Sequence, residues 1–96
     1  MSSLRDLVQA RREQVLAIAA RHHGNRVWLF GSVARGDDRP DSDIDLLVEF
    51  DRDSSLFDVM RMTKELEELL GHPVDVVSTG GLRGGDQNIL SESVEL

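Results

Sequence analysis

The stretch Ser42-Asp-Ile-Asp-Leu-Leu-Val-Glu-Phe50 decides how this chain can fold. Residues 43–50 are charged at their start and apolar after it, which predicts a strand that enters a hydrophobic core. Asp43 and Asp45 are two residues apart, so their side chains project from the same face of that strand. Ile44 between them faces the other way and can join the core. The stretch therefore predicts a strand that presents two carboxylates together.

Two further strands are predicted on either side of residues 43–50, over residues 26–30 and residues 73–77. In the second of these, Asp75 stands between two valines, and an unpaired carboxylate is costly to bury. If this strand lies beside residues 43–50, Asp75 can share the face of the other two carboxylates. If it is an edge strand, Asp75 can simply face water. Both readings are open from the sequence.

Helices are predicted before and after these strands, over residues 3–23, 55–70 and 86–92. The apolar face expected for the helix over 55–70 consists of Leu56, Val59, Met60, Leu66, Leu69 and Leu70. The order helix, strand, strand, helix, strand, helix indicates an α/β fold, with a short mixed sheet of three or slightly more strands packed by amphipathic helices. We expect one domain over residues 1–96, with the glycine-rich segment 78–96 flexible or bound to a partner.

The charge of the chain is concentrated in one short stretch. Residues 37–53 contain eight acidic and two basic side chains, which is −6 of the total net charge of −7. Phosphate backbones require a basic surface, so direct nucleic-acid binding is not expected. The chain contains no cysteine, which fits a reducing cytoplasm, and no apolar run near the roughly 20 residues of a membrane span.

The acidic side chains suggest a metal centre built from oxygen ligands. With no histidine or cysteine beside them, Asp43 and Asp45 favour a hard ion such as Mg²⁺ or Mn²⁺. The alternative is an ordinary solvated strand end, where acidic residues are common. If Asp75 joins them, three carboxylates on one face suit a two-metal site for phosphoryl or nucleotidyl transfer.

Gly31-Ser32 is a candidate anion-binding turn after the strand over 26–30. Glycine permits close approach of the backbone, and a short helix expected from Val33 would offer free N–H groups. The alternative is an ordinary turn that ends a strand. A P-loop is excluded, because Asp37 stands where that motif requires lysine after the second glycine.

Taken together, Leu29-Phe-Gly-Ser-Val-Ala-Arg-Gly36 and Ser42-Asp-Ile-Asp-Leu-Leu-Val48 resemble the signature of the DNA polymerase β-like nucleotidyltransferase superfamily. That signature is Gly-Ser, ten residues, then Asp-x-Asp, and here the ten residues are 33–42. The chain is most similar to the minimal nucleotidyltransferases, which are antitoxins of HEPN/MNT toxin–antitoxin pairs. The resemblance implies the small nucleotidyltransferase fold.

The resemblance also implies roles for six residues. The carboxylates of the signature would bind two Mg²⁺ or Mn²⁺ ions, and the third-strand carboxylate would also act as general base. The Gly-Ser turn would hold the nucleoside triphosphate. The arginine after it would contact a phosphate or a partner, or would simply be a helix residue that pairs with an acid. The catalytic and metal-binding residues implied are Asp43, Asp45 and Asp75, and the nucleotide-binding residues are Gly31, Ser32 and Arg35.

The implied activity is transfer of AMP from ATP to a tyrosine of a cognate HEPN ribonuclease toxin. The chain itself contains no tyrosine, and it leaves few residues for an acceptor pocket, so a partner is expected to complete the site. Two alternatives stay open: a nucleotidyltransferase acting on a small molecule such as an antibiotic, and an antitoxin that neutralises its partner by binding alone.

Overall fold

The computed structural model describes residues 4–36, 39, 42–81 and 93–96. The helix predicted over 86–92 lies outside these residues, as do Asp37 and Asp41 of the acidic stretch. In chain order the elements are α1 (Leu4–Ala10), α2 (Arg12–Arg21), β1 (Gly24–Phe30), α3 (Gly31–Arg35), β2 (Ile44–Phe50), α4 (Leu56–Leu70), β3 (Val74–Ser78), the 3₁₀ turn η1 (Thr79–Gly81) and β4 (Val94–Glu95).

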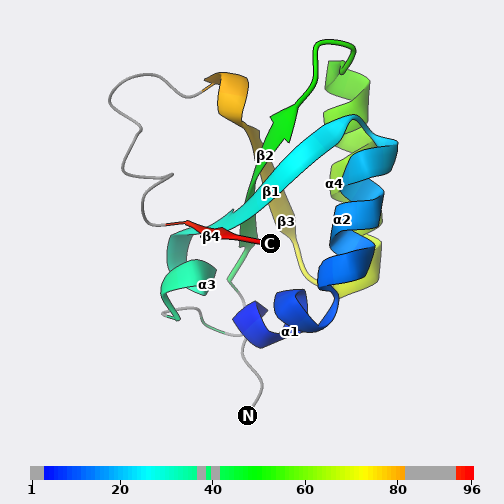
Figure 1. Ribbon diagram of the computed structural model, residues 1–96. Helices are drawn as coiled ribbons and strands as arrows, with labels where there is room; N and C mark the ends of the chain where they lie inside the picture. Colours follow the sequence, from blue (N-terminus) through cyan, green and yellow to red (C-terminus); the bar gives the residue numbers. More distant parts are fainter. Residues whose placement is uncertain (1–3, 37–38, 40–41, 82–92) are drawn as a thin grey trace.

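The strands form one mixed four-stranded sheet in the order β3-β2-β1-β4. β1 pairs antiparallel with β2 and with β4, while β2 and β3 are parallel. Helices α2 and α4 lie side by side along one face of this sheet, and α3 follows the end of β1 (Figure 1). The α/β class and the mixed sheet expected from the sequence are confirmed.

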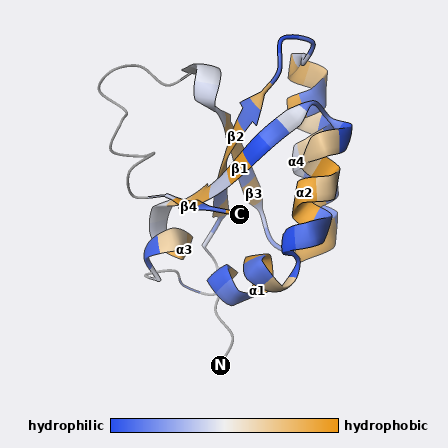
Figure 2. Ribbon diagram, in the orientation of Figure 1, coloured by the Kyte–Doolittle hydropathy of each residue, from blue (hydrophilic) through white to orange (hydrophobic). Residues whose placement is uncertain are grey.

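The hydrophobic core lies between this sheet and the helices. Ile44, Leu46 and Val48 of β2 are fully buried and face the helices, together with Val27 and Leu29 of β1. Both helices turn their hydrophobic segments toward the sheet and their hydrophilic segments outward (Figure 2). Because side chains alternate along a strand, Asp45 and the residues two and four positions after it project from the opposite face of the sheet.

The prediction of a single helix over residues 3–23 is wrong, because a break at Arg11 divides this segment into α1 and α2. The backbone of Arg11 departs from helical geometry, with φ −106° and ψ 17°, and its N–H is shared between the carbonyls of Leu7 and Val8. Residues 9–14 contain no large apolar side chain, so no core contact holds the helix straight there. The break lets α1 contact α3, where Arg5 Nη1 donates a hydrogen bond to the Ala34 carbonyl.

Helix α4 has the predicted bounds within one residue, but its buried face is only partly as expected. At its start the N–H of Ser55 donates a hydrogen bond of 2.9 Å to Asp58 Oδ2 as part of a capping box. At its other end the helix is followed by Gly71, whose φ is +69°. The fully covered residues are Met62, Leu66 and Leu70, with Val59 and Leu69 half-buried. Leu56 and Met60, which were expected on this face, are exposed. The apolar residues span about half the circumference of the helix, and the sheet and α2 cover only the arc around Met62.

Strand β3 satisfies both readings of the sequence, because it is an edge strand and also the neighbour of β2. Strand β4 was not expected from the sequence. Its two residues pair Glu95 with Trp28 and Val94 with Leu29, and Leu96 beyond it is buried in the core. Two residues are too few for any periodic pattern, so only the tertiary structure reveals this strand.

Candidate active site

The register of the central strands brings two predicted carboxylates together. In the parallel pair of β2 and β3, Asp45 stands directly opposite Asp75, so both side chains project from the face of the sheet opposite α2 and α4. Asp43 immediately precedes β2, two residues before Asp45. Asp43 and Asp75 are exposed, whereas Asp45 is half-buried. The three carboxylates predicted from the sequence therefore lie at one end of β2 and its neighbour.

Electrostatics show how closely these groups interact. Burial raises the pKa of Asp45, and the charges of Asp75 and Asp43 raise that pKa further. The positive charge of Arg35, at the end of α3, acts in the opposite direction and lowers it. A cation near Asp45 would relieve the repulsion between the carboxylates, which is the electrostatic condition that a metal site requires.

Gly31 lies directly against the Asp45 carboxylate. Its φ is +76°, a conformation that L side chains rarely adopt, and a Cβ at this position would overlap Oδ2 of Asp45. Helix α3 begins at Gly31 itself rather than at Val33 as predicted, because this single positive φ turns the extended backbone of Phe30 directly into a helix. Ser32 is half-buried at the second position of α3. The Gly-Ser turn thus lies against the Asp45 carboxylate.

The donor chemistry of the site fits a hard divalent ion, since its side chains offer carboxylate oxygens. As they stand, however, no three acidic, histidine or cysteine side chains among the described residues are grouped closely enough to hold a metal ion. Asp43 and Asp75 are exposed, so their side chains have room to turn toward an ion beside Asp45. The structure brings the predicted residues into one neighbourhood, and the metal-binding role of each stays a prediction.

A family model for the nucleotidyltransferase domain matches residues 11–94, which include every element from α2 to η1 and the first residue of β4. The chain belongs to this family. The match contains all six predicted site residues, from Gly31 to Asp75. The chain is accordingly a nucleotidyltransferase by family, as the Gly-Ser and Asp-x-Asp spacing predicted.

Comparison with individual relatives shows which subgroup of the family the chain belongs to. This nucleotidyltransferase is 38% identical over 86 residues to MJ0435 of Methanocaldococcus jannaschii, which is provisionally assigned as a protein adenylyltransferase; the alignment covers 88% of this chain and 92% of that protein. A solved structure provisionally assigned as a minimal nucleotidyltransferase is 47% identical, with a TM-score of 0.88, covering 99% of this chain and 97% of that one. The chain is thus a minimal nucleotidyltransferase, as the resemblance indicated.

More distant structures share the fold. A chain in the complex of a tri-AMPylated Shewanella oneidensis HEPN toxin with its MNT antitoxin superimposes with a TM-score of 0.67 at 17% identity. That superposition covers 91% of this nucleotidyltransferase and 69% of the other chain. At this identity the comparison speaks for the fold alone.

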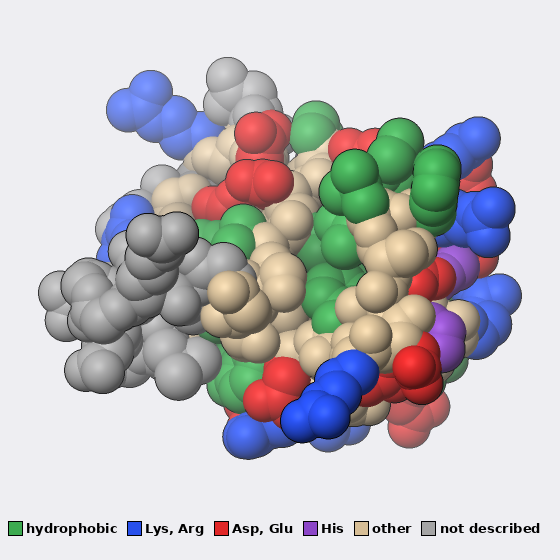
Figure 3. Space-filling view, turned by 90° about the horizontal axis from the view of Figure 1, so that it is seen from above, with side chains coloured by type: hydrophobic (Ala, Val, Ile, Leu, Met, Phe, Trp, Pro, Cys, Tyr) green, Lys and Arg blue, Asp and Glu red, His purple; other side chains and the backbone are tan. Residues whose placement is uncertain are grey.

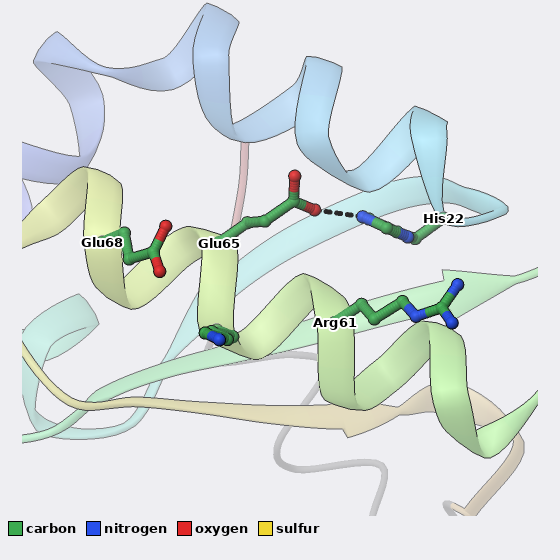
Figure 4. A pocket seen from close by; sticks show the side chains of 5 residues that line it. His22, Arg61, Glu65 and Glu68 are labelled. Carbon is green, nitrogen blue, oxygen red and sulfur yellow. Dashed lines mark hydrogen bonds and ion pairs between the residues drawn. The ribbon is translucent and has the colours of Figure 1, made fainter.

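A hollow that no sequence pattern predicts lies on the other side of the sheet, between α2 and α4 (Figure 4). It measures about 330 Å³ and is lined by His22 at the end of α2 and by Arg61, Lys64, Glu65 and Glu68 of α4. His22 forms a hydrogen bond with Glu65, which lowers the pKa of that carboxyl. None of the predicted site residues lines this hollow.

In the part of the chain that the structure describes, every helix is too short or too polar to span a membrane.

Proposed function

We propose that this minimal nucleotidyltransferase transfers AMP from ATP to a tyrosine hydroxyl of a HEPN ribonuclease toxin and so acts as its antitoxin. The observation that carries the proposal is the pairing of Asp45 with Asp75, with Gly31 held against the Asp45 carboxylate. This arrangement supports the proposal, because the Gly-Ser turn lies beside acidic side chains whose mutual repulsion favours a cation.

The donor nucleotide would lie across the open face of the sheet. Gly31 and Ser32 would hold the triphosphate through backbone N–H groups and the serine hydroxyl, because the first N–H groups of a helix have no intrahelical partner. Arg35 would contact a phosphate. Asp43 and Asp45, joined by Asp75, would hold two Mg²⁺ or Mn²⁺ ions. When bound, such ions neutralise phosphate charge and stabilise the attacking and leaving oxygens.

In the transfer itself, the acceptor oxygen forms a bond to the α-phosphorus of ATP, and the bond between that phosphorus and pyrophosphate breaks. The proton of the acceptor hydroxyl passes to Asp75, the exposed carboxylate at the edge of the sheet. The products are the adenylylated acceptor and pyrophosphate. An acceptor reaching the site from solvent meets Asp75 without having to displace any element of the core.

The acceptor is proposed to be another protein in the cytoplasm. The chain contains no tyrosine, so a tyrosine acceptor must come from a partner. The similarity to a provisionally assigned protein adenylyltransferase over nearly the whole chain supports protein adenylylation. A HEPN toxin as acceptor rests on the resemblance of the Gly-Ser and Asp-x-Asp signature to the minimal nucleotidyltransferases of HEPN/MNT pairs, and the 47% identity to a provisionally assigned minimal nucleotidyltransferase supports that resemblance. We propose that residues 1–96 act as one domain whose segment 78–96 contributes to the contact with this partner.

The test is adenylylation of the protein encoded beside this gene, which the proposal expects to be a HEPN protein. The two purified proteins are incubated with ATP and Mg²⁺, and the intact mass of the HEPN protein is measured. We expect one or more AMP-sized increments on the HEPN protein with wild-type chain. For Asp43→Asn with Asp45→Asn we expect the rate to fall by at least about 10³-fold, because removal of the ligands removes stabilisation of the developing charge.

Ribonuclease activity of the HEPN protein is followed in the same samples. Neutralisation that persists in full with the double variant would show inhibition by contact alone. Folded proteins that show no mass increment, while the chain turns over a small hydroxyl substrate, would show the small-molecule activity instead. As a matched control, Glu49→Gln removes a carboxylate from the same strand beyond the paired aspartates and should leave the increment unchanged.

A further inference from the structure

The start of α4 carries three large apolar side chains that stand in solvent. Leu56 is 74% exposed, Phe57 68% and Met60 59%, and the described residues contain no other exposed large hydrophobic side chain. Figure 3 shows hydrophobic side chains gathered at one rim of the molecule, with basic side chains beside them. These three residues, here called the apolar patch, form a surface on the order of a few hundred Å², the size of the largest apolar patch on a typical monomer, and such patches are often functional.

Opposite charges stand on the two sides of the apolar patch. Asp53 precedes it in the turn before α4, and Arg61 and Lys64 follow it on the same exposed side of the helix. Among the described residues these three side chains form no ion pair. The apolar patch therefore has Asp53 on one side of it and Arg61 and Lys64 on the other, with Arg52 next to Asp53 and Glu68 beyond the two bases.

The basic end of this surface borders the hollow between α2 and α4 (Figure 4). Arg61 and Lys64 line it together with Glu68 and with Glu65, which is hydrogen-bonded to His22. The hollow is open to solvent and has room for a turn or side chain from another molecule. It lies beyond the basic end of the patch, while the turn at Asp53 protrudes beyond the acidic end.

We propose that the apolar patch is the contact between two copies of this chain, packed antiparallel along α4 about a two-fold axis. Such an axis places Phe57 of each copy against Met60 of the other and covers the apolar area of both. It also brings Asp53 of each copy to Lys64 of the other, so the turn before α4 fills the hollow of its partner. Each contact occurs twice, as an isologous interface requires.

A second copy offers what this surface needs with one sequence: an apolar centre, Asp53 opposite Lys64, and a projecting turn opposite each hollow. A standard interface buries about 800 Å² on each partner, and the apolar patch supplies about half of that. The charged rim must supply the rest, so the dimer should be of moderate affinity. Because exposed charges are screened by salt, the affinity should fall as ionic strength rises.

Sedimentation velocity of the full chain tests this proposal. We expect a monomer–dimer equilibrium in the micromolar range at low salt, weakening at high salt. The variant Leu56→Ser with Phe57→Ser should be monomeric at every concentration. Its melting temperature, measured on monomer, should match that of wild type, because both side chains are already exposed.

Charge exchange identifies the pairing. Asp53→Lys and Lys64→Asp should each weaken the dimer about tenfold, and the double variant should restore wild-type affinity, because its charges are again opposite across the axis. Glu13→Lys, an equal charge change on the exposed side of α2, should have no effect. A wild-type chain that stays monomeric at low salt, or a dimer that survives loss of Leu56 and Phe57, would overturn the proposal.

The test of the dimer and the test of the proposed function can fail independently of each other. The predicted site lies at the start of β2 and the apolar patch follows its other end, at opposite ends of the sheet (Figure 1). Nucleotide binding by the Leu56→Ser, Phe57→Ser variant should therefore equal that of wild type. A monomeric wild-type chain whose patch instead binds the HEPN protein would overturn the dimer and leave the transfer activity standing.

Discussion

At the scale of the residue, Asp45 should make stability depend on pH. Burial and the charges of Asp75 and Asp43 raise its pKa, so the folded chain keeps a proton that the unfolded chain has lost. The free energy of unfolding therefore falls as pH rises from the unfolded pKa through the raised folded pKa. Asp45→Asn cannot ionise, so in metal-free buffer we expect its melting temperature to exceed that of wild type by a few degrees at neutral pH.

This difference should disappear at acidic pH, where the carboxyl is protonated in both states. Thermal unfolding followed by circular dichroism across a pH series measures it. Glu13→Gln, which removes an exposed carboxylate from α2, should keep the wild-type pH profile. A variant at Asp45 whose melting temperature stays below that of wild type at every pH would contradict the electrostatic account.

At the scale of the element, the capping box should contribute to the stability of α4. The Ser55 N–H donates a hydrogen bond of 2.9 Å to Asp58 Oδ2. This N–H has no acceptor within the helix, so the Asp58 side chain supplies one. Asp58→Ala removes this acceptor, and we expect a loss of about 1 kcal/mol in the free energy of unfolding. For a domain of this size that corresponds to a decrease of about 4–8 °C in melting temperature.

Asp58→Asn is the matched variant, because it keeps an oxygen acceptor and removes the charge. It should lose clearly less stability than Asp58→Ala when both are measured by urea denaturation. If both variants lose the same amount, the effect comes from the charge, which lies 3.9 Å from His22 Nδ1 and at the positive end of the helix dipole, rather than from the hydrogen bond.

At the scale of the whole molecule, ligand binding should stabilise the fold. A ligand that binds only the folded state adds about 2.7 kcal/mol when present at 100 times its dissociation constant. Mg²⁺ with ATP should therefore raise the melting temperature of wild type by several degrees, measured by differential scanning fluorimetry. The increase should be much smaller for Asp43→Asn with Asp45→Asn, each compared with its own ligand-free value.

ATP with EDTA in place of Mg²⁺ is the control, and it should give a small shift for both proteins. Equal Mg²⁺-dependent shifts in wild type and the double variant would contradict the assignment of these two carboxylates as metal ligands. Raising the salt concentration to match ionic strength separates this effect from general screening of the acidic surface.

Local patterns in the sequence were sufficient for much of this protein. The two-residue period of the strand predicts that Asp43 and Asp45 project together and that Ile44 turns inward, and Ile44 is fully buried in the core. Glycine at position 31 permits the positive φ on which the turn beside Asp45 depends. The spacing of these two motifs was enough to indicate the family that the comparisons confirmed.

Only the tertiary structure decided what depends on contacts between distant segments. The parallel register that sets Asp75 opposite Asp45, and the position of β3 as both edge and neighbour, follow from pairing across 30 residues of chain. The break at Arg11, the pairing of β4 and the exposure of Leu56 and Met60 follow from which surfaces the core can cover. A periodic pattern specifies the faces of one element, but burial is decided by the element that packs against it.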